Sequence, residues 1–189
     1  MGNKHTLHRF CGANLDTRCS LKRVRPLAEV LKYRNPAVID KFLESYAMPR
    51  RDADALFTEL KRWLWLNARA HVIPGSPNIY VIADMTAIDE MWHTFLLFTK
   101  DYQDFCDRYF GHFVHHVPNT DRAMQRDERN ERRRPELVQQ NWEASIRFIC
   151  EQLGERIALR WFKDYPKRFS LAKLDRRRRS HRAIIAAAG

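Results

Sequence analysis

Apolar residues recur at three- and four-residue spacing through most of the chain between residues 36 and 165. This spacing places them on one side of a helix, so it predicts helices rather than strands. The first helix begins at Asn35-Pro36, because Asn is a good cap and Pro suits the first helical turn, and it ends before Pro49. A second helix runs from about Asp52 to His71, and the Pro- and Gly-rich residues 74–78 form a loop after it.

The most apolar predicted helix runs from Thr86 to about Phe110. Its apolar residues cover nearly the whole circumference, which is typical of a central helix. Thr86 and Asp89 have the spacing of a capping box, and Gly111 ends the helix. The residues before it, 79–83, are expected to form an extended, buried connection.

Further helices are predicted in the C-terminal third. The polar run from Asp121 to Arg134 is either a solvated helix or a mobile loop. Pro135 opens a helix that Gly154 ends, and a short helix follows from Glu155 to Tyr165. The apolar stripes of all these helices predict one shared core, which includes Trp63, Trp92, Phe95, Trp142 and Ile149.

These elements predict an all-α fold, a compact helical domain of about five helices with disordered basic termini. A chain of 189 residues fits one domain, and 44% hydrophobic residues are too many for a disordered protein. We expect a loosely ordered basic N-terminal segment at residues 1–25, the helical domain at 26–165, and a basic C-terminal tail at 166–189. Within these, residues 1–20 and 170–189 are expected to be disordered.

The formal net charge of +11 lies at the two ends. Residues 1–25 carry +5 and residues 166–189 carry +7, whereas residues 26–165 carry −1. A domain that reads nucleic acid would carry positive charge on its folded surface, so nucleic acid is expected to bind through the tail only. The residues in question are Arg176, Arg177, Arg178 and Arg179. They either attach nucleic acid or an acidic protein regardless of sequence, or form a solvated tail.

Several classes of protein are not indicated. No stretch approaches the roughly 18 uninterrupted apolar residues of a membrane helix, and the N-terminus has no apolar signal region. The four cysteines are too few and too scattered for a disulfide framework. No phosphate-binding loop or dinucleotide fingerprint occurs, so no nucleotide cofactor is indicated. We therefore expect a cytoplasmic protein with no membrane contact.

One segment carries residues suited to chemistry. Asp89 and His93 lie four apart on one predicted helix, so their side chains share a face. His115 and His116 follow just beyond the end of that helix. If the chain folds back, a carboxylate and two histidines converge, which suits a divalent iron or zinc ion. A ring nitrogen of His116, or else of His115, should then lie within about 5 Å of one of His93.

The same residues also have ordinary structural interpretations. Asp89 fits the helix cap, His93 fits a core histidine with one hydrogen bond, and the later histidines fit a surface loop. We assign Trp92, Tyr102 and Cys106 to a pocket beside the ligands. On a straight helix, however, the 100° step turns Tyr102 and Cys106 to roughly the opposite side from His93.

The pattern of these residues resembles the bacterial branch of the glycine-rich domain-containing protein-like family. The resemblance covers residues 56–118 and, weakly, 142–161. It implies an all-helical fold and the importance of Asp89, Trp92, His93, Tyr102, Cys106, Gly111 and His116, but it implies no reaction. Phe95 stands where plant-like members often have a second histidine, which removes one ligand.

Two functions follow from these observations. The first is a metal-binding helical protein, a metal-dependent enzyme of the oxygenase or hydrolase type acting on a small molecule or peptide. The second is a non-catalytic helical interaction module whose basic tails contact nucleic acid or an acidic protein.

Overall fold

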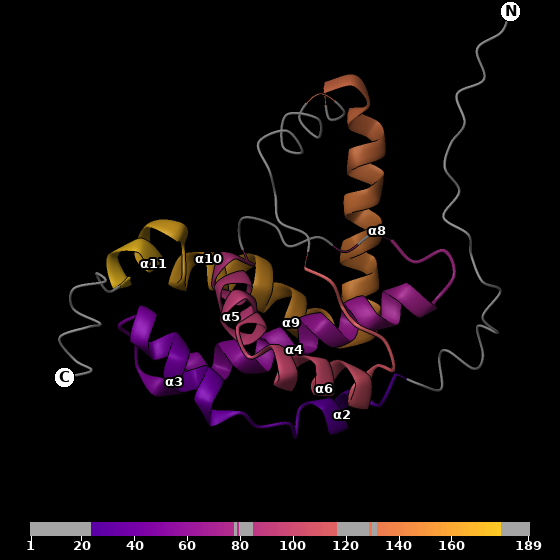
Figure 1. Ribbon diagram of the computed structural model, residues 1–189. Coiled ribbons are helices and arrows are strands. Elements are labelled where there is room, and N and C mark those ends of the chain that lie inside the picture. Colours follow the sequence, from indigo (N-terminus) through magenta and orange to yellow (C-terminus); the bar gives the residue numbers. More distant parts are fainter. Residues whose placement is uncertain (1–23, 78, 80–84, 117–128, 130–131, 179–189) are drawn as a thin grey trace, which may run out of the picture.

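The computed structural model describes residues 24–77, 79, 85–116, 129 and 132–178, and there the chain is all-α, as predicted (Figure 1). None of these residues forms a strand, although Tyr46 and Arg178 make an isolated β-bridge. The elements in chain order are α2 (Leu27–Val30), α3 (Pro36–Ser45), α4 (Arg50–Val72), α5 (Thr86–Leu96), α6 (Thr99–Tyr109), α8 (Pro135–Leu153), α9 (Glu155–Leu159), the π-helix η2 (Arg160–Asp164), α10 (Tyr165–Arg168) and α11 (Leu171–Arg177). No helix in the described ranges is long and apolar enough to span a membrane.

The long helix α4 organises the body. It packs against α2, α3, α5 and α8, and Figure 1 shows it running through the middle of the molecule. The first half of α8 stands away from the body in the same view, and every residue from 135 to 144 is exposed. The body therefore holds the core, and the free half of α8 lies outside it.

Local signals set several helix ends as predicted. The Asn35 side chain accepts a hydrogen bond from the Val38 backbone N–H at 3.3 Å, with Pro36 in the first turn of α3. The Asn35 amide also donates to Asp101 Oδ2 at 2.8 Å, which ties α3 to α6. Gly154 ends α8 with a φ of 86°, a conformation that favours glycine.

The single helix predicted from Thr86 to Phe110 is wrong, because α5 and α6 are separate helices with a break at Leu97 and Phe98. Leu97 is 69% exposed, so the apolar residues are not buried all round. The break turns α6 back beside α5, and the rings of Phe95 and Tyr102 meet edge to face at 5.1 Å. Thr86 is the first helical residue and Met85 holds the cap position, so the predicted capping box is also wrong.

The expected C-terminal tail is folded between residues 166 and 178. α11 packs against α5, and Phe169 and Leu174 are each only 2% exposed. The Ala47 backbone N–H donates to the Arg177 carbonyl at 2.7 Å. Disorder is therefore the wrong prediction for residues 170–178, because a few well-spaced apolar residues dock a mainly basic helix. The predictions for 1–23 and 179–189, and nearly all of those for 79–83 and 121–131, fall outside the described residues.

The predicted core needs one correction. Trp63, Trp92, Phe95 and Ile149 belong to one buried cluster, but Trp142 is 39% exposed. Trp142 lies on the free half of α8, and its ring meets the ring of Phe162 edge to face, with centroids 5.4 Å apart. The apolar stripe of α8 continues beyond the point where the body ends.

Candidate metal centre

Helix α5 brings Asp89 and His93 together as predicted. They lie one turn apart, and His93 Nδ1 is 3.7 Å from Asp89 Oδ2. The His93 side chain is 49% exposed and the Asp89 side chain 26% exposed. The pair therefore faces solvent and is not sealed in the core.

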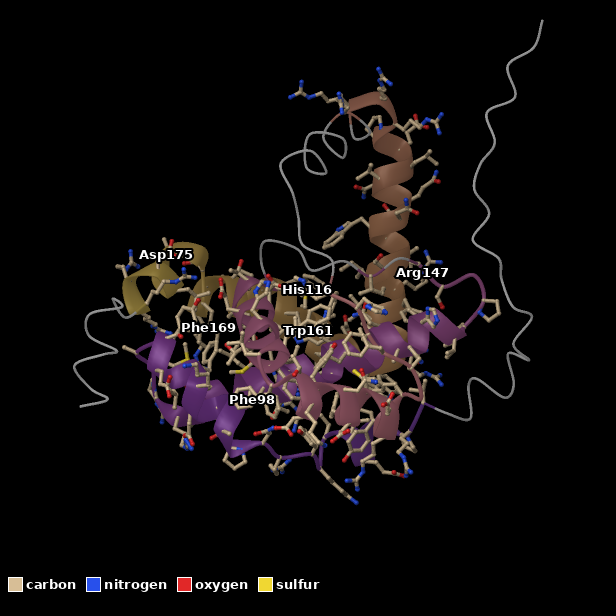
Figure 2. All side chains as sticks on the ribbon, viewed as in Figure 1. Phe98, His116, Arg147, Trp161, Phe169 and Asp175 are labelled. Atoms are coloured by element: carbon tan, nitrogen blue, oxygen red, sulfur yellow. The ribbon has the colours of Figure 1, made fainter. Side chains whose placement is uncertain are left out.

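The segment after α6 returns over this pair. Gly111, at a φ of 71°, makes the turn at the end of α6. His116 Nε2 lies 3.0 Å from Asp89 Oδ1, and the rings of His93 and His116 are 4.5 Å apart between centroids. One ligand atom from each of Asp89, His93 and His116 lies within 4.8 Å of the other two. The predicted approach of His116 to His93 is confirmed, and Figure 2 shows His116 on the upper side of the body in that view.

A buried hydrogen-bond chain holds the returning segment in place. The Tyr102 hydroxyl donates to the Val114 carbonyl at 2.6 Å and accepts from Trp92 Nε1 at 3.1 Å. The thiol of Cys106 also meets the backbone of Val114. Val114 stands two residues before His116, so these contacts position His116 over α5.

The sequence analysis assigned Trp92, Tyr102 and Cys106 to a pocket beside the ligands, but the structure places them in the core. They are 5%, 1% and 0% exposed, and they contact the returning segment from inside the core. The break between α5 and α6 is the reason, because it brings Tyr102 back toward Trp92 instead of continuing a straight helix. The Trp92 ring also meets the His116 ring edge to face, with centroids 4.5 Å apart, which fixes the orientation of the imidazole.

Burial keeps two of these groups neutral. It raises the pKa of Tyr102 well above the ordinary range and raises the pKa of Cys106 to about 11. The Cys106 thiol therefore stays protonated near neutral pH, and a thiol is a poor ligand and a poor nucleophile. Asp89, His93 and His116 therefore remain the candidate metal ligands of this region.

The other histidines of the segment lie apart from this group. His115 is exposed, and its ring packs on that of Phe113 with centroids 4.8 Å apart. Successive side chains of an extended segment point in opposite directions, so Val114 and His116 face the body and His115 faces away. His112 lies with its ring 4.7 Å from that of His71, and burial, followed by the charge of His71, lowers the pKa of His112.

The predicted arginine tail is largely engaged by the body. Arg178 Nη2 donates to the Tyr46 hydroxyl at 2.9 Å and to Glu90 Oε1 at 3.2 Å. The Arg177 guanidinium lies over the Phe169 ring at 5.7 Å. Arg176 is exposed, and Arg179 lies outside the described residues. At least two of the four arginines therefore hold α11 against the body. Arg178 does so through Glu90, which directly follows Asp89 of the candidate site.

Sequence reasoning missed a buried polar cluster on the other side of α4. Glu59 is 2% exposed, and it accepts hydrogen bonds from Arg62 at 2.7 Å, from Arg160 at 2.6 Å and from Trp161 Nε1 at 2.9 Å. These contacts tie α4 to the π-helix η2. A glutamate on a long helix normally belongs to the solvated face, so no local pattern distinguishes this one.

Comparison with known proteins gives one finding. A family model described as UCP032817-like matches residues 27–160, which is most of the chain. Neither the curated proteins nor the solved structures contain a match to the chain. The match overturns the resemblance to the glycine-rich domain-containing protein-like family, which depended on a few positions within α5, α6 and the returning segment. By the extent of the match, the chain belongs to the UCP032817-like family.

Proposed function

We propose that this protein binds one divalent iron or zinc ion through Asp89, His93 and His116. The observation that supports this most is the convergence of three ligand atoms, from two segments of the chain, within 4.8 Å of one another. Two imidazoles and one carboxylate are a set that both ions accept. The buried contacts of Val114 hold this arrangement without any ion, so little reorganisation is needed for binding.

Two of the three distances between ligand atoms approach those of a shared ion, and all three atoms lie within 4.8 Å of one another. Two ligands that lie about 2.0–2.1 Å from one ion at tetrahedral or octahedral angles are roughly 3.0–3.4 Å apart. The Asp89 carboxylate lies 3.0 Å from His116 and 3.7 Å from His93. His93 is the most exposed of the three, so a small rotation of its side chain closes the remaining gap.

Three protein ligands would leave coordination positions free for water or substrate. An ion in such a site polarises a bound carbonyl or lowers the pKa of bound water, and iron in a two-histidine, one-carboxylate site supports oxygenase chemistry. The exposed side of His93 supplies the approach from solvent. The proposal therefore extends to a hydrolase or oxygenase acting on a small molecule or peptide.

Metal binding is tested on tag-free protein by elemental analysis and by calorimetric titration with zinc. We expect one equivalent of metal, and at least about ten-fold weaker binding in His93→Ala and in His116→Ala. The matched control is His115→Ala, which changes a neighbouring exposed histidine outside the group. A wild-type protein that binds no zinc or ferrous iron rejects the proposal, and so does an equal loss in His115→Ala.

A second measurement separates a metal centre from a histidine–aspartate pair that only stabilises the fold. Zinc at one hundred times its Kd should stabilise the wild type by about 2.7 kcal/mol, because it binds only the folded state. His93→Ala should fold normally in chelator, since His93 is half exposed, and should gain much less from zinc. Equal stabilisation of both proteins would show that the ion binds elsewhere.

A second candidate function, a helical interaction module, is supported by the free half of α8. Leu137, Val138 and Trp142 are 47%, 38% and 39% exposed there, beside the exposed residues 132–134, which are all arginine. Exposed apolar residues next to charge are typical of a protein-binding surface. A Trp142→Glu variant that retains every binding partner of the wild type in a crosslinking comparison would argue against it.

A further inference from the structure

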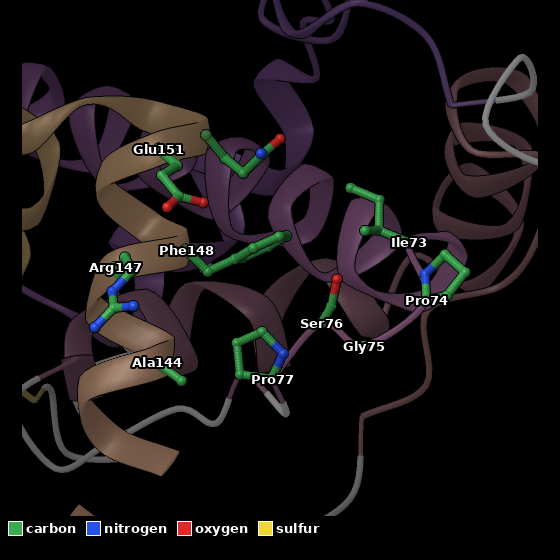
Figure 3. Close-up of a pocket in the computed structure, with 10 residues that line it drawn as sticks. Ile73, Pro74, Gly75, Ser76, Pro77, Ala144, Arg147, Phe148 and Glu151 are labelled. Atoms are coloured by element: carbon green, nitrogen blue, oxygen red, sulfur yellow. The ribbon is translucent and has the colours of Figure 1, made fainter. Parts of the chain in front are cut away.

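The last turn of α4 carries His71, which is exposed and lies just before the loop that follows the helix. That loop and α8 border a hollow of about 290 Å³ (Figure 3), whose described lining residues include no histidine. His71 instead meets His112 of the returning segment, residues 111–116, with ring centroids 4.7 Å apart and ring planes tilted by 36°. The segment that carries His116 is therefore packed, through a second histidine, against a histidine of the central helix.

His112 is partly buried, and only one of its two ring nitrogens has a hydrogen-bond partner. Nδ1 lies 3.2 Å from the Phe110 carbonyl. Because a carbonyl oxygen can only accept, Nδ1 carries the hydrogen, and Nε2 of the neutral ring carries none. Nε2 is buried and has no hydrogen-bond partner among the described residues. The surroundings therefore suit the neutral ring, in which Nε2 needs no acceptor.

The groups around His112 oppose a second proton on its ring. Burial disfavours the charged ring most, and the positive charge of a protonated His71 disfavours it further. The Phe110 carbonyl favours the proton, but its influence is the smallest of the three. In the described part of the chain, His71 on α4 is the titratable group whose charge acts on His112, and Phe110 at the end of α6 adds no charge. The pKa of His112 is therefore lowered below its ordinary value of 6.5.

We propose that His112 makes the returning segment sensitive to acid. A proton on Nε2 places a positive charge on a buried nitrogen that has no acceptor and that belongs to a ring packed on His71. The ring then leaves this position and the segment loosens. Val114 and His116 follow two and four residues later, so the same change withdraws His116 from Asp89. For this last step the inference rests on the metal centre proposed above, whereas the loosening of the segment does not.

The direction of the pH effect follows from proton binding. Between the lowered pKa of His112 and 6.5, the chain with the segment released binds more protons than the chain with the segment docked. The docked segment is therefore most stable above pH 6.5, and it loses stability as the pH falls through this range.

A bound metal ion explains the two histidines less well. Nε2 of His112 is buried within the protein, and Nδ1 is already occupied by the Phe110 carbonyl. In the described part of the chain, no third histidine, cysteine or carboxylate joins the two rings to form a set of ligands. A neutral ring packed in place needs no ion.

The test uses the full chain in chelator, so that its result does not depend on metal. Hydrogen exchange of the Val114 amide, corrected for the intrinsic effect of pH, reports the opening of the segment, and NMR of the imidazole protons reports the titration of His112. We expect a His112 midpoint below 6.5. The protection of Val114 should fall at least about three-fold from about pH 7.5 to about pH 5. A midpoint at or above 6.5, or protection that is independent of pH, overturns the proposal.

Three variants assign the effect to the two histidines. His112→Gln removes the titrating ring, so Val114 protection should lose most of its dependence on pH. His71→Gln removes the facing charge, so the His112 midpoint should move to higher pH and Val114 protection in acid should exceed that of the wild type. His71 is exposed, so this variant keeps the fold even if His112→Gln is destabilised. His115→Gln, an exposed histidine of the same segment, is the matched control and should behave as the wild type. An equal effect of His115→Gln and His71→Gln overturns the proposal.

Zinc affinity connects the segment to the metal centre. Zinc binding weakens in acid in every variant, because the ligating histidines take up protons. From about pH 7.5 to about pH 6 the loss should be at least about three-fold larger in the wild type than in His112→Gln. Equal losses overturn the control of zinc binding by His112. A protein that binds no zinc rejects the metal centre, while the exchange of Val114 still decides whether the segment is sensitive to acid.

Discussion

The hydroxyl of Tyr102 can be removed without changing the shape of the core. It donates to the Val114 carbonyl at 2.6 Å and accepts from Trp92 Nε1 at 3.1 Å. Tyr102 is 1% exposed, so water cannot readily replace the hydroxyl. Tyr102→Phe keeps the ring and its contact with Phe95, and it removes both hydrogen bonds at once.

The expected loss of stability in Tyr102→Phe follows from the two groups that lose their hydrogen-bond partner, the Val114 carbonyl and Trp92 Nε1. A buried donor or acceptor that loses its partner costs about 1–3 kcal/mol. Trp92 and Val114 are 5% and 8% exposed, so each keeps some access to water, and we expect a total loss of about 2–4 kcal/mol in the free energy of unfolding. Because Val114 holds His116 over α5, zinc affinity should also fall, by about ten-fold.

Unfolding by urea in chelator, followed by tryptophan fluorescence, measures the first effect, and zinc titration of the folded variant measures the second. Tyr109→Phe is the matched control on the same helix. Tyr109 is 5% exposed, and no hydrogen bond to its hydroxyl is seen among the described residues, so its loss should change stability by less than about 0.5 kcal/mol. If the two variants lose equal stability, or if Tyr102→Phe keeps the wild-type zinc affinity, the role assigned to this hydroxyl is wrong.

Three further changes test other parts of the fold. Leu174→Ala should cost about 2–4 kcal/mol in urea unfolding, because α11 is docked by this buried side chain, whereas Arg176→Ala on the same helix should cost less than about 0.5 kcal/mol. Glu59→Gln should cost about 3 kcal/mol in the same assay, because it leaves two arginines without their buried counter-charge; a loss below about 1 kcal/mol would contradict this. Burial, followed by the charges of nearby arginines, lowers the pKa of Lys61 from 10.5 to about 8. Between these two pH values the unfolded chain binds more protons than the folded protein. The contribution of Lys61 to the free energy of unfolding therefore rises with pH. The stability of the wild type relative to Lys61→Met should therefore increase from about pH 7 to about pH 9, and a flat or falling difference would refute the shift.

The parts of the fold that the sequence predicts are those encoded by neighbouring residues. Asn35 caps α3, Pro135 opens α8 and Gly154 ends it, because each acts on the backbone within a few positions. The break between α5 and α6 has no Gly or Pro to mark it, and it follows from the packing of Phe95 against the next helix. The docking of α11 likewise depends on a distant surface, since few of its residues are apolar.

The candidate site also has one part that neighbouring residues encode and another part that depends on tertiary packing. Asp89 and His93 share a face because of helical spacing alone, which the sequence contains. The choice of His116 over His115 depends on the contact between Tyr102 and Val114, which turns Val114 and His116 toward the body and His115 away from it. That contact exists only because α6 turns back beside α5, so a straight-helix interpretation assigns Tyr102 to the wrong side.

The position of His93 distinguishes best between a metal centre and a structural device. Asp89 and His116 form a hydrogen bond at 3.0 Å that would by itself attach the returning segment to α5. His93 adds little to that attachment, because it is half exposed, lies 3.7 Å from the carboxylate, and such surface pairs contribute about 0–1 kcal/mol. A shared ion would give His93 a much larger role, since it would supply one of three ligands. The ratio of its effect on zinc affinity to its effect on stability in chelator therefore decides the matter: a large ratio supports the metal centre, and a ratio near one would leave Asp89 and His116 as a folding contact.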